Sequence, residues 1–278
     1  MNKTLFISDL DGTLLNKDAE LSEYAKKALN SMISDGLCFS IATARTLASA
    51  GVILADLDLQ IPVILMNGVL IYDTKKQSYI QVNTLPVETV AAVIDILEKS
   101  DATGFMYELN DGKLKTFYES LEQKPLRDFA EERMTLYNKP FYHTDSFSDV
   151  SPEHIIYFAL LDTQERLQPV HAALQTMDGF SIAFYKDNYS PDLWYLELFS
   201  TEASKRSAVC YLRGAYGYER VIGFGDNTND IPMFEACDVR VAVENATPEV
   251  KAAADHICAA NGADGVVKWL EEKLCKSV

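Results

Sequence analysis

The chain has 278 residues, of which 48% are hydrophobic and 24% charged, as in an ordinary globular protein. Its formal net charge of −16 and the lack of a basic run argue against nucleic acid or anionic membrane surfaces as partners. No apolar run reaches membrane-spanning length and the first acids come too early for a signal peptide, so we expect a cytoplasmic protein. The five scattered cysteines indicate reduced thiols rather than zinc ligands or disulfides.

The first predicted element is a buried strand that ends in two acids. Residues 5–7 are apolar at every position, which is typical of a parallel strand covered on both faces, and Asp9 and Asp11 follow. Residues two apart on an extended segment point the same way, so both carboxylates can face one site at the carboxyl end of this strand. Their repulsion calls for a positive partner, and Mg²⁺ fits because it needs only one or two carboxylates besides phosphate oxygens.

Two other interpretations exist for this stretch. Asp and Gly are turn formers, so the acids could belong to a solvated loop. The acid spacing also approaches that of an EF-hand calcium loop, but Leu14 stands where that loop needs glycine, and a strand rather than a helix precedes it. The calcium loop is therefore rejected, whereas the solvated loop stays open on these residues alone.

The next 70 or so residues alternate between helix and strand. The pattern predicts a helix between Ser22 and Gly36, a strand over 37–42, a helix over 47–55, a strand over 62–66 and a hairpin over 69–83. This order implies right-handed crossovers and a parallel sheet. Thr43 and Arg45 follow the second strand and Asn67 follows the third, so all three belong to the same edge as Asp9. Arg45 and Asn67 are candidate substrate contacts, although a structural role is equally open for both.

The pattern changes near residue 85. We predict helices over 87–99, 122–136 and 164–177, alternating strands with exposed faces over 104–109 and 113–118, and further strands over 154–161 and 180–186. This α+β segment carries no acid pair or phosphate-binding signature of its own. We therefore expect an α/β core with a parallel sheet and helices on both faces, built from residues 1–84 and 190–278, and an inserted second domain at residues 85–189.

The buried-strand pattern returns at residue 194 and brings two more polar groups. A strand is predicted over 194–199 and a helix over 204–214, with Lys205 in the first turn of that helix. The strand over 220–224 precedes the sequence GDNTND, in which Asp226 and Asp230 flank a polar turn. A helix from 231, a strand over 239–243 and helices over 248–254 and 263–276 complete the chain.

Four polar groups thus belong at or beside the carboxyl ends of strands: the pair Asp9 and Asp11, then Thr43, then Lys205, and the pair Asp226 and Asp230. Each has a structural interpretation when taken alone. Thr43 could cap a helix, Lys205 could be a solvated helix residue, and Asp226 could form a turn. Together they are two acid pairs, a hydroxyl and a cation, the set that metal-assisted phosphoryl transfer through a carboxylate nucleophile requires.

These residues also resemble a known family. DLDGT at 9–13, Thr43, Lys205 and GDNTND at 225–230 look like the four motifs of the haloacid dehalogenase superfamily. The insert between the second and third motifs is similar to that of its Cof-like branch, cytosolic phosphatases of the sugar-phosphate type with an α/β cap domain. The resemblance covers nearly the whole chain. It departs at Ala44 and Arg206, which stand where this branch usually has glycine; neither change removes a catalytic group.

The resemblance implies a role for each motif residue. Asp9 would attack phosphorus and carry a phosphoaspartyl intermediate, while Asp11 would protonate the leaving oxygen and later deprotonate the water. Thr43 and Lys205 would hold the phosphoryl oxygens. The side chains of Asp9 and Asp226 and the backbone carbonyl of Asp11 would bind Mg²⁺.

Two further residues would support the metal loop: Asp230 would order Lys205 and metal-bound water, and Asn229 would hold the same loop. The resemblance therefore implies a Mg²⁺-dependent phosphatase for a small phosphorylated metabolite, with specificity set by the inserted domain. A phosphomutase that uses the same intermediate and a phosphate-binding regulatory protein without catalysis are the alternatives. The sequence specifies neither the substrate nor the oligomeric state.

Overall fold

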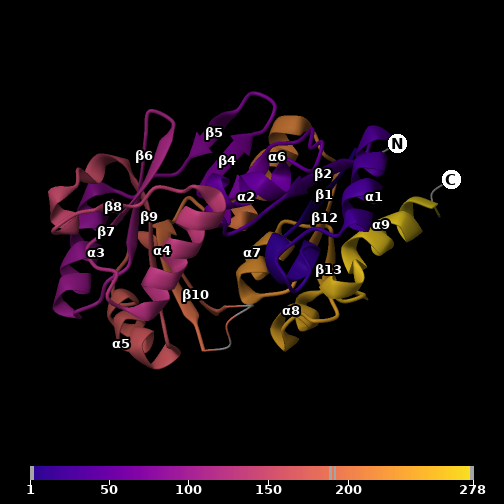
Figure 1. The fold of residues 1–278 in the computed structure, drawn as a ribbon. Helices are drawn as coiled ribbons and strands as arrows, with labels where there is room; N and C mark the ends of the chain where they lie inside the picture. Colours follow the sequence, from indigo (N-terminus) through magenta and orange to yellow (C-terminus); the bar gives the residue numbers. More distant parts are fainter. Residues whose placement is uncertain (1–2, 188–189, 191, 276–278) are drawn as a thin grey trace. The chain divides into compact units, whose positions relative to one another are not determined.

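A computed structural model describes residues 3–187, 190 and 192–275 of the chain. The chain divides into two compact units, the first made of Met1–Gln81 with Ser204–Val278 and the second of Val82–Ala203 (Figure 1). The first unit is therefore assembled from two separate lengths of chain. In the described part of the chain, no helix combines the length and apolar character that crossing a membrane requires.

The first unit is built on a parallel sheet of five strands in the order β14-β13-β12-β1-β2. The strands are β1 (Thr4–Ser8), β2 (Cys38–Ile41), β12 (Arg220–Gly225), β13 (Val239–Val243) and β14 (His256–Cys258). The chain passes from β1 to β2 on one side and from β12 to β14 on the other, so its direction across the sheet reverses between β1 and β12. Ligands bind at such a reversal in open α/β sheets, at the carboxyl ends of the strands.

Helices cover both faces of this sheet, as the sequence pattern predicts. They are α1 (Glu23–Ser34), α2 (Leu47–Leu54), α6 (Lys205–Tyr216), α7 (Ile231–Glu235), α8 (Pro248–Ala253) and α9 (Gly265–Cys275). Phe224 of β12 packs edge-on against Trp269 of α9, whereas its neighbour Gly223 faces Cys237 just beyond α7. Successive residues of a strand point to opposite faces, so α9 and α7 lie on opposite sides of the sheet. The predicted α/β fold class is confirmed.

A small antiparallel sheet follows α2 and consists of β3 (Val63–Leu65), β4 (Leu70–Asp73) and β5 (Ser78–Val82). The sequence pattern predicts β3 as a third strand of the parallel sheet. In the structure β3 contacts that sheet through an isolated parallel bridge between Ala42 and Ile64 and takes β4 as its ladder partner. The strand is therefore present, but its pairing is mainly antiparallel.

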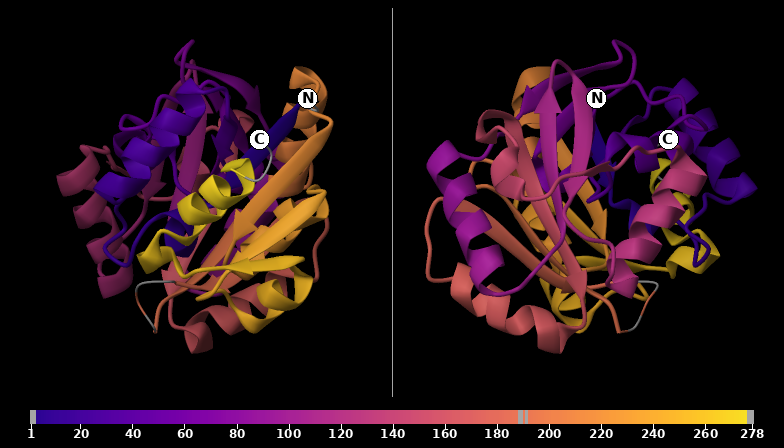
Figure 2. Two further views of the ribbon diagram at one scale, coloured as in Figure 1. Left: turned by 90° about the vertical axis from the view of Figure 1, so that its right-hand side faces the viewer. Right: turned by 60° about the vertical axis from the view of Figure 1, so that its left-hand side comes forward.

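The second unit has its own sheet of six strands in the order β10-β11-β9-β6-β7-β8. They are β6 (Phe105–Asn110), β7 (Lys113–Tyr118), β8 (Tyr142–His143), β9 (Ile155–Asp162), β10 (Phe180–Lys186) and β11 (Trp194–Ser200). Helices α3 (Val87–Lys99) and α5 (Gln164–Leu174) form an apolar core with one face of this sheet. Helix α4 (Lys124–Tyr137) packs on the other face of the sheet (Figure 2, right view). Phe129 of this helix stacks on Phe105 of β6.

The structure corrects the sequence prediction at the second domain boundary. The predicted strand from residue 194 exists as β11, but it pairs antiparallel with β9 and β10 in the second unit. Both faces of β11 are covered, so its sequence is a run of mostly apolar residues like that of a strand in the parallel sheet. The boundary therefore lies near residue 203 rather than residue 190.

Candidate active site

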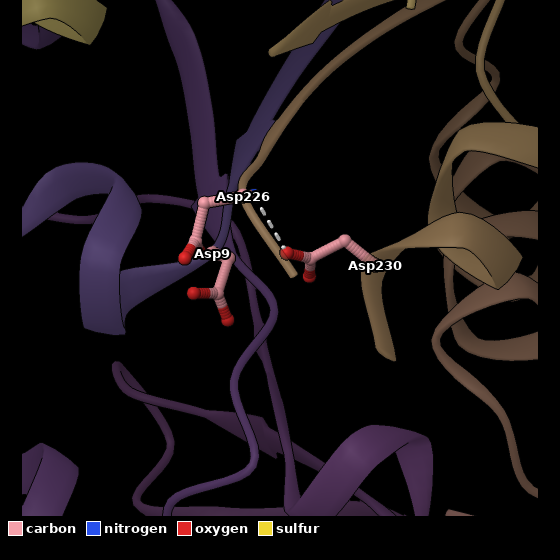
Figure 3. Close-up of side chains that lie close together, drawn as sticks. All are labelled: Asp9, Asp226 and Asp230. Atoms are coloured by element: carbon pink, nitrogen blue, oxygen red, sulfur yellow. Dashed lines mark hydrogen bonds between the residues drawn. The ribbon is translucent and has the colours of Figure 1, made fainter. Parts of the chain in front are cut away.

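Two neighbouring strands of the first unit bring two aspartates side by side. Asp9 follows β1 and Asp226 follows β12, and the Asp9 amide donates to the carbonyl oxygen of Phe224 at 3.0 Å, which extends the ladder by one residue. Each aspartate is only 5% exposed. Figure 3 shows the two carboxylates adjacent, with Asp230 reaching toward them from the helical turn that follows β12. Residues more than 200 apart in the chain thus share one small volume.

Lys205 connects two of these carboxylates. Its Nζ lies 2.7 Å from Oδ1 of Asp9 and 2.7 Å from Oδ1 of Asp230, and the whole side chain is 1% exposed. Burial by itself would lower the pKa of Lys205, but the charges of Asp230 and Asp9 outweigh it and raise that pKa above its usual value. The lysine is therefore a fixed positive charge. It is the first residue of α6, whose N-terminus is held by a capping box between Ser204 and Ser207.

Asp230 uses its second oxygen to shape the loop after β12. Oδ2 accepts the amide of Asp226 at 2.9 Å (dashed line in Figure 3). The same oxygen accepts the amide of Asn227 at 3.2 Å, while Oδ1 accepts from Lys205. Gly225 permits this close approach, because a Cβ there would lie 2.7 Å from the Cβ of Asp230. Both oxygens of Asp230 are thus engaged with the protein, so this residue orients its neighbours.

Thr13 holds the other aspartate of the pair. Its Oγ1 donates to Oδ1 of Asp226 at 2.7 Å, and the threonine is 1% exposed. The loop between Asp9 and Thr13 is fixed from the far half of the chain as well, since Nδ2 of Asn245 donates to the carbonyl oxygen of Gly12 at 2.7 Å. Gly12 has φ of +80°, a conformation that glycine adopts without strain.

The site carries more negative than positive charge. One oxygen each from Asp9, Asp226 and Asp230 lies within 4.8 Å of the others. Burial raises the pKa of Asp9 to about 8, against the opposing charge of Lys205 and with help from Asp230 and Asp11. Burial and the charge of Asp230 also raise the pKa of Asp226 well above its usual value. A cluster of hard oxygen donors in which negative charge exceeds positive charge fits a divalent cation of the Mg²⁺ or Ca²⁺ type.

Asp11 points to a different partner. Arg45 donates to it through Nε, 2.7 Å from Oδ2, and through Nη2, 2.6 Å from Oδ1. Their side chains are 26% and 13% exposed, so the pair is shielded but not sealed from water. Such a two-point contact fixes the carboxylate plane as well as its position. Arg45, a candidate substrate contact from the sequence, thus engages Asp11 in this structure.

Thr43 lies in the loop after β2, and a hydrogen bond joins it to Asn67 in the turn Met66–Gly68 after β3. Thr43 is 1% exposed, its Oγ1 accepts the amide of Arg45 at 3.1 Å, and its carbonyl oxygen accepts the amide of Asn67 at 3.0 Å. Asn229 reaches the same turn from the loop after β12, with Nδ2 3.4 Å from Oδ1 of Asn67. The turn therefore links the loops that follow β2, β3 and β12.

The backbone of this turn is strained. Met66, Asn67 and Gly68 all have positive φ, at 49°, 54° and 98°. The turn packs so tightly against the start of α6 that a Cβ on Gly68 would lie 2.1 Å from the carbonyl oxygen of Ser204. Strain of this kind persists only where the surrounding contacts enforce it, and it is frequent at functional sites. Here the contact fixes the residue that precedes Lys205.

The structure brings the sequence-selected residues into two linked groups. Asp9, Lys205, Asp226 and Asp230 form one through direct contacts, and Asp11, Arg45, Thr43, Asn67 and Asn229 form the other. Sequence reasoning overlooked two supporting residues. Thr13 was visible within the DLDGT motif, and Asn245 could have been found because it closely follows β13 at the same edge of the sheet.

Arg206, one of the two departures from the usual motif, lies outside these contacts. It forms a 3.6 Å ion pair with Glu235 in which the side chains are 61% and 56% exposed. The change from glycine therefore places a charge on the surface of α6. Ala44 lies between Thr43 and Arg45, and nothing in its surroundings explains the difference.

Comparison with known proteins identifies the family. Residues 6–270 match the haloacid dehalogenase-like hydrolases. The chain is 27% identical to the 5-amino-6-(5-phospho-D-ribitylamino)uracil phosphatase YwtE of Bacillus subtilis (strain 168), with 96% of each chain covered. It is 26% identical to the pyridoxal phosphate phosphatase YbhA of Escherichia coli (strain K12), with 99% of this chain and 100% of the relative covered.

A solved structure supports the fold. A haloacid dehalogenase-like hydrolase from Bacteroides thetaiotaomicron superposes with a TM-score of 0.80 at 22% identity, covering 97% of this chain and 99% of the other. The resemblance predicted from four short motifs is therefore confirmed over nearly the full length of the chain. The chain belongs to the haloacid dehalogenase-like hydrolases, and it is a phosphatase of that family.

Proposed function

We propose that this phosphatase hydrolyses a small phosphorylated metabolite through a phosphoaspartyl intermediate on Asp9, with Mg²⁺ as its cofactor. The observation that carries the proposal is the position of Lys205, whose Nζ lies 2.7 Å from a buried carboxylate oxygen of Asp9, next to Asp226 on the neighbouring strand end. A carboxylate nucleophile, a fixed cation and a second acid in one buried site suit transfer of a dianionic phosphoryl group.

Asp9 is suited to attack because a carboxylate needs no base to activate it. One of its oxygens forms a bond to phosphorus while the bond from phosphorus to the leaving oxygen breaks. Lys205 and the Thr43 hydroxyl are the groups that would hold the phosphoryl oxygens and offset their charge. Loss of one such contact typically costs about 2 to 4 kcal/mol of transition-state stabilisation.

Asp11 is the residue that would move the proton. It would protonate the leaving oxygen in the first step and take a proton from the water that releases phosphate from Asp9 in the second. In this structure both of its oxygens accept hydrogen bonds from Arg45. Each carboxylate oxygen has a second lone pair, so a proton can be taken up there while Arg45 keeps the carboxylate in place.

Asp9, Asp226 and the backbone carbonyl of Asp11 are the groups that would hold the metal ion. A divalent cation supplies positive charge to the phosphoryl oxygens and offsets the repulsion between the carboxylates and the substrate. Asp230 is better suited to orient Lys205 and the loop, since both of its oxygens are bonded to protein donors. Asn229 supports the same loop from the other side through Asn67.

A small metabolite is proposed as the substrate because two relatives that match over nearly their full length are named for small phosphorylated compounds, a ribitylaminouracil phosphate and pyridoxal phosphate. The two compounds differ in structure, and the chain is only 27% and 26% identical to the two relatives. The proposal is therefore limited to the class of phosphate monoesters of small metabolites.

The test is Mg²⁺-dependent release of inorganic phosphate from p-nitrophenyl phosphate, followed by a panel of phosphorylated metabolites. Wild-type protein should release phosphate, and Asp9→Asn should not, because an amide is a poor nucleophile. Activity that survives in Asp9→Asn would rule out the proposed nucleophile. Conversion of a sugar phosphate to its isomer without phosphate release would instead identify a phosphomutase.

A further inference from the structure

The second unit contains a buried charge that the proposed reaction does not use. Lys139 follows the C-terminal end of α4 and is 4% exposed. Among the residues that the structure describes, its Nζ has neither a hydrogen-bond nor an ion-pair partner; its contacts are the rings of Tyr107 and Phe141, whose centroids lie 4.7 Å and 4.8 Å away. Lysine is almost never buried to this extent without a partner.

The two rings do not compensate for this burial. A desolvated cation–π contact contributes about 2 kcal/mol, whereas removing an ammonium from water costs several kcal/mol. The nearby cation Arg133 destabilises the protonated form of Lys139 further. Burial and the charge of Arg133 together lower the pKa of Lys139 to about 7. The group thus lacks an anion, and its ordinary protonated state would be restored if one were bound.

The surroundings of Lys139 are aromatic. Phe129 stacks on Phe105 with ring centroids 5.0 Å apart and meets Phe141 edge-on at 6.4 Å. The guanidinium of Arg133 lies 3.4 Å from the Phe129 ring centroid, and its side chain is 21% exposed. Phe105 and Tyr107 belong to β6 and point away from the face that α3 and α5 cover, because Met106 between them belongs to that core.

Nearby acids do not fill the role of the missing anion. Arg133 pairs with Glu132 at 2.9 Å, but that carboxylate is 54% exposed and makes no contact with Lys139. Glu197 on β11 is 5% exposed and accepts a hydrogen bond from the hydroxyl of Tyr185 at 2.9 Å. The charge of Glu197 acts on Tyr107, whereas Arg133 is the charged group that acts on Lys139.

We propose that Lys139 and Arg133 form a binding site for the anionic group of a small organic ligand, whose carbon skeleton packs against the rings of Tyr107 and Phe141. A carboxylate or a phosphate would accept hydrogen bonds from the ammonium, and apolar or flat carbon groups suit aromatic walls. All residues of the proposed site belong to the second unit. None of them is among the residues of the carboxylate site in the first unit, and the proposal does not depend on the reaction proposed there.

The experiment uses the full-length protein and three probes: benzoate, phenylphosphonate and inorganic phosphate. Reductive methylation followed by peptide mapping measures how fast the Lys139 amine reacts with and without each probe. Lys99 serves as an internal reference, since it lies in the same unit with 72% of its side chain exposed and pairs with Asp95. We expect at least one organic anion to slow methylation of Lys139 at least fivefold in a saturable manner, while Lys99 is unaffected. This measurement needs no variant and no catalytic turnover.

Equilibrium titration of the same probe into variants gives the second readout. Lys139→Met should bind it about ten- to a hundredfold more weakly than wild type, because hydrogen bonds to charged groups are worth that much. Lys99→Met is the matched control and should bind as wild type. Equal affinity in Lys139→Met and wild type would overturn the proposal, as would failure of all three probes to protect Lys139. Because hydrolysis is not measured, a negative result here leaves the proposed phosphatase reaction untouched, and the reverse also holds.

Discussion

Arg45 donates two hydrogen bonds, 2.7 Å and 2.6 Å long, to the carboxylate of Asp11, which lies 34 positions earlier in the chain. Such a fork fixes a planar carboxylate in a way that the point charge of a lysine does not reproduce. Asp11 is the proposed acid and base, and Arg45 fixes the position of its carboxylate before substrate binds. Arg45 is therefore a positioning residue for the proton transfer.

We predict that Arg45→Lys lowers kcat about ten- to a hundredfold, because misplacing a reacting group by about 1 Å has an effect of that size. The folded state should be little affected, since a positive charge remains beside Asp11. Steady-state kinetics with a phosphate monoester would measure kcat and KM separately. The control is Arg206→Lys, which alters an exposed arginine outside the site and should leave both constants unchanged. An unchanged kcat in Arg45→Lys would show that the fork has no part in catalysis.

Thr13 is predicted to tune metal binding through Asp226. Its hydroxyl donates to the proposed metal ligand at 2.7 Å, and loss of such a supporting bond typically weakens metal affinity about ten- to a hundredfold. Thr13→Val keeps the shape of the side chain and removes the donor, so half-saturation should require correspondingly more Mg²⁺. Thr13→Ser retains the hydroxyl and should resemble wild type. Identical Mg²⁺ dependence in the valine and serine variants would contradict this role.

Removal of divalent cations should abolish hydrolysis and lower thermal stability. Asp9, Asp226 and Asp230 are buried and each place an oxygen within 4.8 Å of the others, so a bound divalent cation that offsets their repulsion should stabilise the folded state. Excess EDTA should eliminate phosphate release and lower the unfolding midpoint, and added Mg²⁺ should restore both. Full activity in excess EDTA would contradict a metal requirement.

Gly68 is predicted to be more sensitive to substitution than another glycine with the same backbone conformation. Gly68 and Gly36 have φ of 98° and 99°, but a Cβ on Gly68 would lie 2.1 Å from the Ser204 carbonyl oxygen, whereas a Cβ on Gly36 meets nothing within 4 Å. Gly36→Ala should cost about 1 to 2 kcal/mol of unfolding free energy from backbone strain. Gly68→Ala should cost about 1 to 3 kcal/mol more from the clash.

Denaturant unfolding of both variants gives this difference directly. Gly68→Ala should also lower kcat, because the displaced turn would shift Ser204 and with it Lys205. Gly36→Ala should keep wild-type kcat. Equal loss of unfolding free energy in the two variants would mean that the turn around Gly68 accommodates a Cβ without a clash and would contradict the prediction.

The fold and the chemical groups of the site were predictable because buried parallel strands leave a clear sequence pattern. Continuous apolar runs before Asp9 and Asp226 located two strand ends, and ends of parallel strands meet at one edge of a sheet. That reasoning needed no knowledge of loop conformation. It also explains how residues far apart in the chain could be assigned to one location.

Other features depend on information that the local sequence does not contain. Strand β11 is buried on both faces, so its pattern does not distinguish the parallel sheet from the antiparallel sheet that it joins. Strands β8 and β14 have only two and three residues, too few for a recognisable period. The contact between Arg45 and Asp11 depends on the conformation of two loops, and Asn245 reaches Gly12 across 233 residues.

The nucleophile can be identified by trapping the covalent intermediate. Wild-type protein is mixed with a ³²P-labelled phosphate monoester and Mg²⁺, quenched in acid within milliseconds, digested and mapped. If Asp9 attacks phosphorus, the label should appear on the peptide that contains Asp9, withstand acid, be released by hydroxylamine and be missing from Asp9→Asn. Label on any other residue, or labelling of Asp9→Asn equal to that of wild type, would contradict the account.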